Sequence, residues 1–399
     1  MSPTPQRLID EHRRLFDRAA DQIRLVRSPY RICPLGAHVD HQLGLVTGMA
    51  VDAAIWLAYA PNADGRIRLH SLDFSPPVEF DVRDVPAKIN SNWGNYARGA
   101  AWALNLRTPL QRGFDGVVAG SLPIGGLSSS AAVGIAYLLA LEDVNGLTIS
   151  PLDNVEFDRA IENGYVGLNN GILDPSMILL SRPQHLTALD CQSMQFDHIE
   201  SPLKDDDFDL VIVFSGAGRT LVNSGYNQRV AECAAASAQL LLSANLHVEG
   251  TPRLRHVPEE IFHAHQHELA APLRKRAAHF FAENQRVRHG LDAWRSGDIR
   301  RFGELMTQSG ESSINNYEAG SPHLIALHEI LNGCEGVYGA RFAGGGFDGC
   351  CIGLADPAKR ADIIETIARE YPARHPDVVE TYRVFFQKPD GAACYWEAR

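Results

Sequence analysis

The segment RICPLGAHVDH, residues 31–41, gathers side chains that can do chemistry around a single glycine. Arg31 brings a permanent positive charge, while His38, Asp40 and His41 offer hydrogen-bond donors and acceptors close together in the chain. Such a loop could bind a metal ion, a sugar, or nothing at all. The residue types alone leave these three alternatives open.

A loop rich in glycine and serine, GSLPIGGLSSSAAVGIAYLLAL, runs directly into a helix-forming sequence at residues 120–141. Its glycines let backbone N–H groups approach oxygen atoms closely, and its serine hydroxyls add donors or a metal ligand. The start of the helix adds positive partial charge, so the loop predicts a phosphate site. A plain strand-to-helix connection is the structural alternative. Because the Gly-Lys-Ser/Thr ending and a G-x-S-x-G elbow are both missing, Walker-type nucleotidases and serine hydrolases are disfavoured.

A second glycine cluster, GARFAGGGFDGCCIGL, occupies residues 339–354. Gly344, Gly345 and Gly346 stand just before a strand-like run. They could let the backbone approach a ligand, or they could simply form a tight hairpin.

Asp174 lies in an apolar setting within IENGYVGLNNGILDPSMILLS, residues 161–181, which also contains Glu162. A carboxylate in such surroundings is costly unless a partner or a metal ion stabilises it. Asp174 is therefore a candidate functional residue, with capping of a helix near Ser176 as the structural alternative.

Taken in this order, the four segments resemble the GHMP kinase superfamily, and most closely its galactokinase-like sugar-1-kinases. Residues 31–40 resemble the galactokinase signature, residues 122–132 the phosphate loop, and residues 339–349 the C-terminal glycine motif. WGNYARG (93–99) and SGYNQRVAEC (224–233) fall at further similar places. The resemblance implies an α+β fold of two domains, residues 1–207 and 208–399, with mixed sheets covered by helices and the active site in the cleft between the domains.

The resemblance also implies ATP and Mg²⁺ as cofactors and a role for each site residue. Asp174 would be the catalytic carboxylate and Arg31 its cationic partner, while Glu162 would bind Mg²⁺ with help from Ser129 or Ser130. The other implied site residues are Ala37, His38, Asp40, Gly171 and Tyr226 for the sugar, Pro123, Gly125, Gly126, Leu127, Ser128, Ser129, Ser130 and Ala131 for ATP, and the glycine motif Gly344, Gly345 and Gly346.

Ala37 stands where galactokinases carry a glutamate that receives the C6 hydroxyl of the sugar. An alanine removes a negative charge that would repel a C6 carboxylate, which favours D-galacturonate and makes the resemblance closest to galacturonokinases. Galactose and L-arabinose stay open as substrates, as does a sugar sensor without catalysis. Arg98 is the candidate partner of the carboxylate, with a structural ion pair as the alternative. Pro175, Asp348 and a phosphate loop that is one glycine shorter are further departures.

Composition and net charge favour a globular protein and disfavour a nucleic-acid-binding one. The 399 residues are 45% hydrophobic and 21% charged, which is typical of a globular protein and long enough for two domains. Acidic residues outnumber basic ones by 48 to 37, and the net charge of −11 argues against binding to nucleic acid or to anionic membranes. We expect a small sugar or sugar acid and ATP as partners. The sequence does not fix the oligomeric state.

The cysteines and the absence of targeting segments indicate the compartment. The seven cysteines are scattered and odd in number, so neither a disulfide framework nor a zinc site is indicated. The uncharged run at residues 116–141 is interrupted by Pro123, Gly125 and Gly126, and the first residues lack the apolar stretch of a signal peptide. We therefore expect a cytoplasmic protein that does not span a membrane.

Alternating strands and helices must position the candidate residues. An acidic run, SPLKDDDFD at residues 201–209, predicts the junction between the two domains. The hydrophobic periodicity predicts strands at 46–59 and 67–72, helices at 95–104 and 131–144, a buried strand after residue 209, a helix-rich region at 226–310, and strands near residues 339 and 351.

Overall fold

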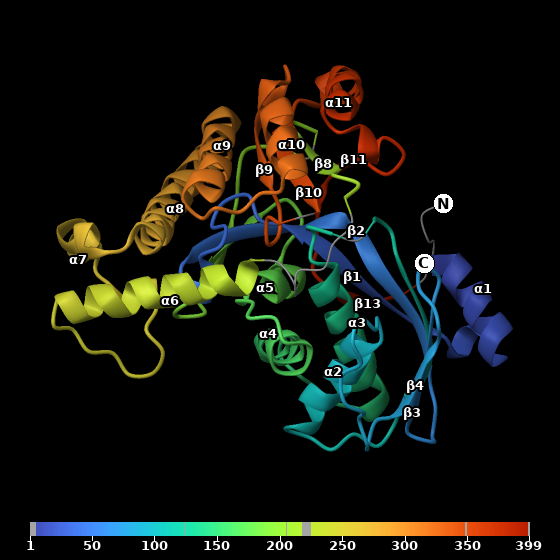
Figure 1. Ribbon diagram of the computed structural model, residues 1–399. Coiled ribbons are helices and arrows are strands. Elements are labelled where there is room, and N and C mark those ends of the chain that lie inside the picture. The colour runs from blue at the N-terminus through green and yellow to red at the C-terminus, as the bar shows by residue number, and fades with distance from the viewer. Residues whose placement is uncertain (1–4, 124, 205, 218–224, 348, 398–399) are drawn as a thin grey trace.

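Two β-sheets form the framework of the protein, and helices cover them (Figure 1). This computed structural model describes residues 5–123, 125–204, 206–217, 225–347 and 349–397. Four residues of the segments discussed above, Ile124, Asp205, Ser224 and Asp348, lie outside the described residues.

The long strand β2 (Leu45–Pro61) is central to the first sheet. Most of its residues are apolar and buried, as expected of a strand that is covered on both faces. It pairs antiparallel with β1 (Arg24–Ile32) on one side and with β5 (Phe114–Gly120) on the other. The other strands of this sheet are β3 (Arg66–Ser71), β4 (Val78–Asp81), β6 (Leu186–Asp190), β7 (Phe196–Ile199), β12 (Pro389–Asp390) and β13 (Cys394–Trp396).

Different helices cover the two faces of this sheet. On one face α3 (Ser129–Asn145) and α5 (Leu173–Leu180) pack on β1 and β2, and α2 (Asn95–Asn105) and α4 (Pro151–Arg159) pack outside them. On the opposite face α1 (Pro5–Phe16) covers a separate small apolar cluster, and Figure 1 shows it beyond the sheet from α2 and α3. Alternate side chains along the strands point to opposite faces of the sheet, so some belong to the main hydrophobic core and others to this small cluster under α1.

Helix α3 is buried around most of its circumference, which explains its almost uniformly apolar sequence. It begins at the glycine- and serine-rich loop and ends before Gly146, whose φ of +65° is the left-handed conformation common at helix ends. The start of α3 is thereby held in the core, where it faces the cleft described below.

The second sheet has the strand order β11-β8-β10-β9 and is antiparallel throughout. Helix α9 lies so close to β9 that a methyl group at Gly339 would sit 1.9 Å from the carbonyl oxygen of Gly303. The elements of this part are β8 (Asp209–Phe214), α6 (Tyr226–Ser243), α7 (Glu259–His265), α8 (Ala271–Ser296), α9 (Ile299–Asn315), α10 (Pro322–Gly333), β9 (Val337–Phe342), β10 (Cys350–Ala355), α11 (Arg360–Arg374) and β11 (Arg383–Gln387).

The end of the chain returns to the first sheet. Strand β12 pairs with β2, and β13 pairs with β1, where Trp396 packs edge-on against Trp56 at 5.2 Å. Strand β13 thus covers the edge that β1 would otherwise present. The expected division at residue 207 assigned these last strands to the second domain, whereas the structure places them in the first sheet.

The strands and helices expected from hydrophobic periodicity are confirmed, with shifts of a few residues at their ends. The uncharged run at residues 116–141 divides into β5, a loop and α3. Within the described residues, no helix combines the length and the apolar character needed to cross a membrane.

A tight contact between β2 and α5 gives a first prediction. An added methyl group at Gly48 would lie 2.4 Å from Cγ of Met177, so Gly48→Ala should lower the free energy of unfolding by about 1–3 kcal/mol through overpacking. Urea unfolding measures this. Gly333→Ala is the control, because nothing lies within 4 Å of the added methyl group there. When Met177 is also changed to alanine, Gly48→Ala should lower the free energy of unfolding by less. An equal loss with and without Met177→Ala would show that Met177 does not restrict the space at Gly48.

Candidate active site

A cavity of about 1080 Å³ lies between the two sheets and their helices. Its walls come from the ends of β1 and β5, the starts of α3, α5 and α6, and the loop between β9 and β10. Ligand cavities in proteins commonly have volumes of roughly 300–1,000 Å³, so this one lies at the upper end of that range.

The centre of the cavity is an ion pair between Arg31 and Asp174. Nη2 and Nε of Arg31 donate to Oδ1 of Asp174 at 2.6 and 2.7 Å, and Nη1 donates to the carbonyl oxygen of Gly126 at 3.1 Å. The hydroxyl of Ser128 donates to the second carboxylate oxygen. Burial alone would lower the pKa of Arg31, but the negative charge of Asp174 raises it. Asp174 thus has both oxygens engaged as an acceptor.

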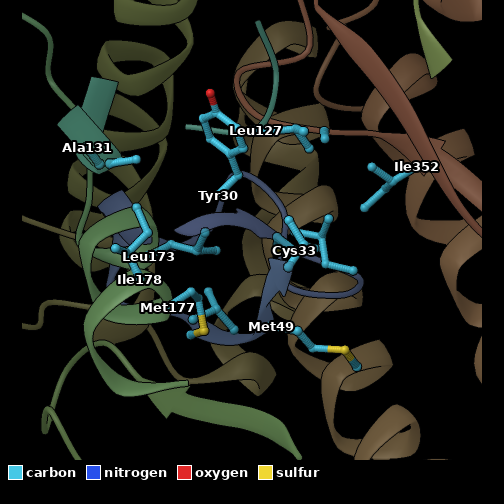
Figure 2. Packing of buried hydrophobic residues seen from close by; sticks show 14 of the residues in the cluster. Tyr30, Cys33, Met49, Leu127, Ala131, Leu173, Met177, Ile178 and Ile352 are labelled. Atoms are coloured by element: carbon cyan, nitrogen blue, oxygen red, sulfur yellow. The ribbon is translucent and has the colours of Figure 1, made fainter. Parts of the chain in front are cut away.

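Packing of the core fixes the two elements that carry this pair. Arg31 lies near the end of β1, and its side chain is 2% exposed. Asp174 occupies the first turn of α5, where the helix dipole favours a negative charge. Figure 2 shows Leu173 and Met177 of α5 in one apolar cluster with Tyr30 of β1. The pair is therefore held between two rigid elements.

The two glycine-rich segments meet at one wall of the cavity. Gly125 and Gly126 have φ angles of +130° and +82°, and Ser128, at the start of α3, has a φ of +58°. A methyl group at Gly349 would lie 2.7 Å from the backbone nitrogen of Gly126, and one at Gly344 would lie 3.1 Å from its oxygen. Only glycines allow both the left-handed backbone and this close approach. The wall consists of backbone with N–H groups and a helix start, which suits phosphate oxygens.

The loop at residues 36–41 forms another wall. The oxygen Oδ2 of Asp40 accepts a hydrogen bond from the backbone of Leu173 at 3.3 Å, and a methyl group at Gly171 would lie 2.2 Å from the same oxygen. Burial and the charge of Asp174 raise the pKa of Asp40 to about 6. Asp40 therefore still accepts hydrogen bonds at neutral pH, and Gly171 leaves the space for them.

His38 lies in the same loop in a left-handed conformation and stacks on Tyr317, with ring centroids 4.2 Å apart. Burial first, and then the electrostatic effects of His279 and Arg341, hold the pKa of His38 well below its ordinary value. The ring is therefore neutral. Its Nε2 has no hydrogen-bond partner within the described part of the chain.

Helix α8 holds this loop from behind through Glu283, which no local sequence signal had indicated. Its Oε1 accepts hydrogen bonds from the backbone N–H groups of Gly36 and Ala37 at 2.8 and 3.2 Å, and Arg286 donates to its Oε2 at 2.7 Å. Burial by itself would raise the pKa of Glu283, yet nearby positive charges, led by Arg286, lower it to about 2. Gly36 and Ala37 lie about 250 positions away from Glu283 in the sequence, which explains why sequence patterns did not reveal this contact.

Two buried carboxylates, those of Asp158 and Glu162, lie beside α3, and neither forms an ion pair within the described residues. Oε1 of Glu162 and both carboxylate oxygens of Asp158 are buried without a hydrogen-bond partner in the described chain. Burial and the charge of Asp174 raise the pKa of Glu162 to about 7. A hard cation prefers oxygen ligands, and Glu162 with the hydroxyls of Ser129 and Ser130 offers such ligands at the start of α3.

Comparison with known proteins identifies the family. The model of the GHMP kinases N terminal domain matches residues 95–182, and that of the GHMP kinases C terminal domain matches residues 289–373. A galacturonokinase from Arabidopsis thaliana is 45% identical over 376 residues, covering 89% of this chain and 88% of the relative. The chain belongs to the GHMP kinase family.

Other relatives of this GHMP kinase agree with that assignment. A galactokinase from Roseiflexus sp. (strain RS-1) is 33% identical over 348 residues, covering 87% of each chain. The crystal structure of Lactococcus lactis galactokinase complexed with galactose has a TM-score of 0.89 at 27% identity, covering 97% of this chain and 98% of that one. The fold class expected from the sequence is thereby confirmed.

The cavity of this GHMP kinase gathers most of the site residues expected from the sequence. Leu127 and Ala131 instead belong to the apolar core behind the loop (Figure 2), and neither Glu162 nor Gly346 is in the wall itself. The expected residues that line the cavity are Arg31, Ala37, His38, Asp40, Pro123, Gly125, Gly126, Ser128, Ser129, Ser130, Gly171, Asp174, Tyr226, Gly344 and Gly345.

Arg98, the expected partner of the sugar carboxylate, does not line the cavity either. Its Nη1 donates to the side-chain oxygens of Asn92 and Asn95 at 2.9 and 3.3 Å, and its guanidinium lies over the ring of Phe80 at 5.9 Å. Helix α2 directs it toward β4 and the preceding loop because its apolar face must cover α3. In the described chain it has no carboxylate partner either, so neither expected role of Arg98 is supported.

The contact between α8 and the loop gives a second prediction. Glu283→Gln should lower the free energy of unfolding by about 2–3 kcal/mol, because a neutral amide weakens three charge-assisted hydrogen bonds and leaves Arg286 without its partner. Urea unfolding measures the loss, and faster amide hydrogen exchange at Gly36 and Ala37 locates it. Glu304→Gln on α9 is the control, since that side chain is 59% exposed. Equal, small losses for both variants would show that Glu283 does not anchor the loop.

Proposed function

We propose that this GHMP kinase transfers the γ-phosphoryl group of ATP to the anomeric hydroxyl of D-galacturonate, giving D-galacturonate 1-phosphate and ADP. The observation that carries the choice of substrate is Ala37, which lines the cavity where a side-chain carboxylate would repel a sugar acid. The 45% identity to a galacturonokinase supports the same choice.

The sugar would lie against the loop at residues 36–41 and the start of α5. Asp40 accepts hydrogen bonds from its hydroxyls, and Gly171 leaves them room. Tyr226 and His38 contribute further walls of the cavity. Directional hydrogen bonds of this kind allow an enzyme to distinguish sugar epimers.

ATP would lie along the wall made by the two glycine-rich segments. Backbone N–H groups at residues 125–130 and the start of α3 would bind its phosphates. Glu162, Ser129 and Ser130 would hold Mg²⁺, which when bound neutralises charge on the β- and γ-phosphates. The unpartnered oxygens of Glu162 and Asp158 support this placement of the cation.

Asp174 and Arg31 would act on the reacting atoms. The bond from the anomeric oxygen to phosphorus forms in line as the bond from phosphorus to the β–γ bridging oxygen breaks, and ADP leaves with that electron pair. Asp174 either accepts the proton of the anomeric hydroxyl or orients that hydroxyl while Arg31 stabilises charge on the transferred group. In both roles the pairing with Arg31 holds the carboxylate of Asp174 in place beside the reacting atoms.

The state of the cysteines supports a reducing compartment. All seven are free, and six of them are buried. We place this kinase in the cytoplasm, where thiols stay reduced and ATP is available.

Asp174→Asn tests the catalytic assignment. We expect turnover to fall about 10³-fold or more, because the amide fills the same volume but cannot bind a proton or balance Arg31. The variant should still fold, as circular dichroism below its unfolding transition checks, although the unbalanced charge of Arg31 lowers its free energy of unfolding. Asp197→Asn, at an exposed position of β7, is the matched control and should keep normal turnover. A fully active Asp174→Asn variant would remove this residue from the mechanism.

Substrate choice is tested by ADP release with Mg-ATP and D-galacturonate, D-galactose, D-glucuronate or L-arabinose. We expect galacturonate to give the highest kcat/KM. Ala37→Glu should lower kcat/KM for galacturonate about 100-fold and raise kcat/KM for galactose. Ala37→Gln, whose side chain has the shape of glutamate but no charge, should lower kcat/KM for galacturonate less. If L-arabinose leads instead, Ala37 serves a sugar without a C6 group, and the proposed substrate is wrong.

A further inference from the structure

Three arginines of the described chain are at most 2% exposed: Arg31, Arg276 and Arg341. The first pairs with Asp174, and Arg276 pairs with Glu232 and Glu318 at 2.7 Å each. Arg341 has no such partner, because no carboxylate oxygen of a described residue lies within 4.0 Å of its guanidinium. Arg341 is thus the one of these three arginines that has no ion-pair partner among the described residues.

The hydrogen bonds of Arg341 leave its charge unbalanced. Its Nε donates to the carbonyl oxygen of Phe342 at 3.1 Å, and Nη1 donates to that of Cys33 at 3.5 Å. No hydrogen bond of Nη2 is found in the described chain. A buried cation without an anion is costly, and burial lowers the pKa of Arg341 accordingly.

The nearest acid cannot serve as the partner of Arg341. Glu283 influences Arg341 through its charge, but both of its oxygens are already engaged. Oε1 accepts hydrogen bonds from two backbone N–H groups and from Ser309, and Oε2 pairs with Arg286. Arg341 therefore keeps the capacity to bind an additional anion.

The position of Arg341 indicates where that anion would come from. Arg341 lines the cavity together with Ala37 and His38, on the part of the wall that faces the sugar in the proposed function. Position 37 carries no acid there, and Nε2 of the neutral His38 has no partner. This corner of the cavity presents a cation and a free imidazole nitrogen, a combination suited to a carboxylate.

We propose that Arg341, assisted by His38, binds the C6 carboxylate of the sugar acid and so makes this kinase selective for a uronic acid. The inference rests on the proposed function and adds the residue that recognises the acid group. It replaces Arg98, which does not line the cavity. The ligand class is a pyranose that carries a carboxylate in place of the hydroxymethyl group.

The test compares Arg341→Gln with Arg98→Gln, a matched change of another buried arginine outside the cavity wall. The readout is the ratio of kcat/KM for D-galacturonate to that for L-arabinose, which has the same ring without C6. We expect the ratio to fall roughly 10- to 100-fold in Arg341→Gln, as for the loss of a hydrogen bond between charged groups, and to stay within about twofold of wild type in Arg98→Gln. Equal losses for both sugars in Arg341→Gln would mean a merely structural role and would overturn the proposal.

A measurement on the wild-type enzyme covers the case in which Arg341→Gln does not fold. D-galacturonamide has the size of galacturonate but no charge at C6. We expect its KM to exceed that of galacturonate about tenfold or more, and equal KM values would overturn the proposal. The proposed function fails separately, if wild-type enzyme prefers L-arabinose or galactose over galacturonate.

Discussion

The buried ion pair of Arg31 and Asp174 is the interaction on which the rest of the site depends. It joins the end of β1 to the first turn of α5, and through Gly126 and Ser128 it also binds the glycine- and serine-rich loop. Removing one member of a buried pair leaves the other charge uncompensated, which is strongly destabilising. The pair therefore fixes, in one cluster, the three segments that form the centre of the cavity.

Close backbone approach is the second constraint. The two glycine-rich segments come from distant parts of the chain, and Gly126, Gly344 and Gly349 let them touch. Space is equally tight at Gly171, where any side chain would collide with Asp40. Backbone groups consequently form much of the cavity wall, while the charged side chains are few and individually placed. The negative charges near Glu162 and the positive charge of Arg341 occupy different regions, as two ligands of different chemistry require.

Local chemistry made much of this predictable from the sequence. Residues 31–40, 120–141 and 339–349 each carry their signal in a short stretch, and the periodicity of β2 and α3 revealed the elements around them. Contacts between residues far apart in the chain leave no such local signal in the sequence. The role of Glu283 depends on a loop about 250 positions away, and β13 pairs with β1 across almost the whole chain. Arg98 and Arg341 look alike in sequence, and only tertiary packing separates them.

The most direct test of the account is the chemistry of the product. Wild-type enzyme would be incubated with Mg-ATP and D-galacturonate, and the anomeric proton followed by NMR with and without decoupling of phosphorus. We expect one new anomeric signal that is split by phosphorus and that forms in step with ADP. Release of inorganic phosphate with unsplit sugar signals, or phosphorus coupled to a proton at another carbon, would contradict it.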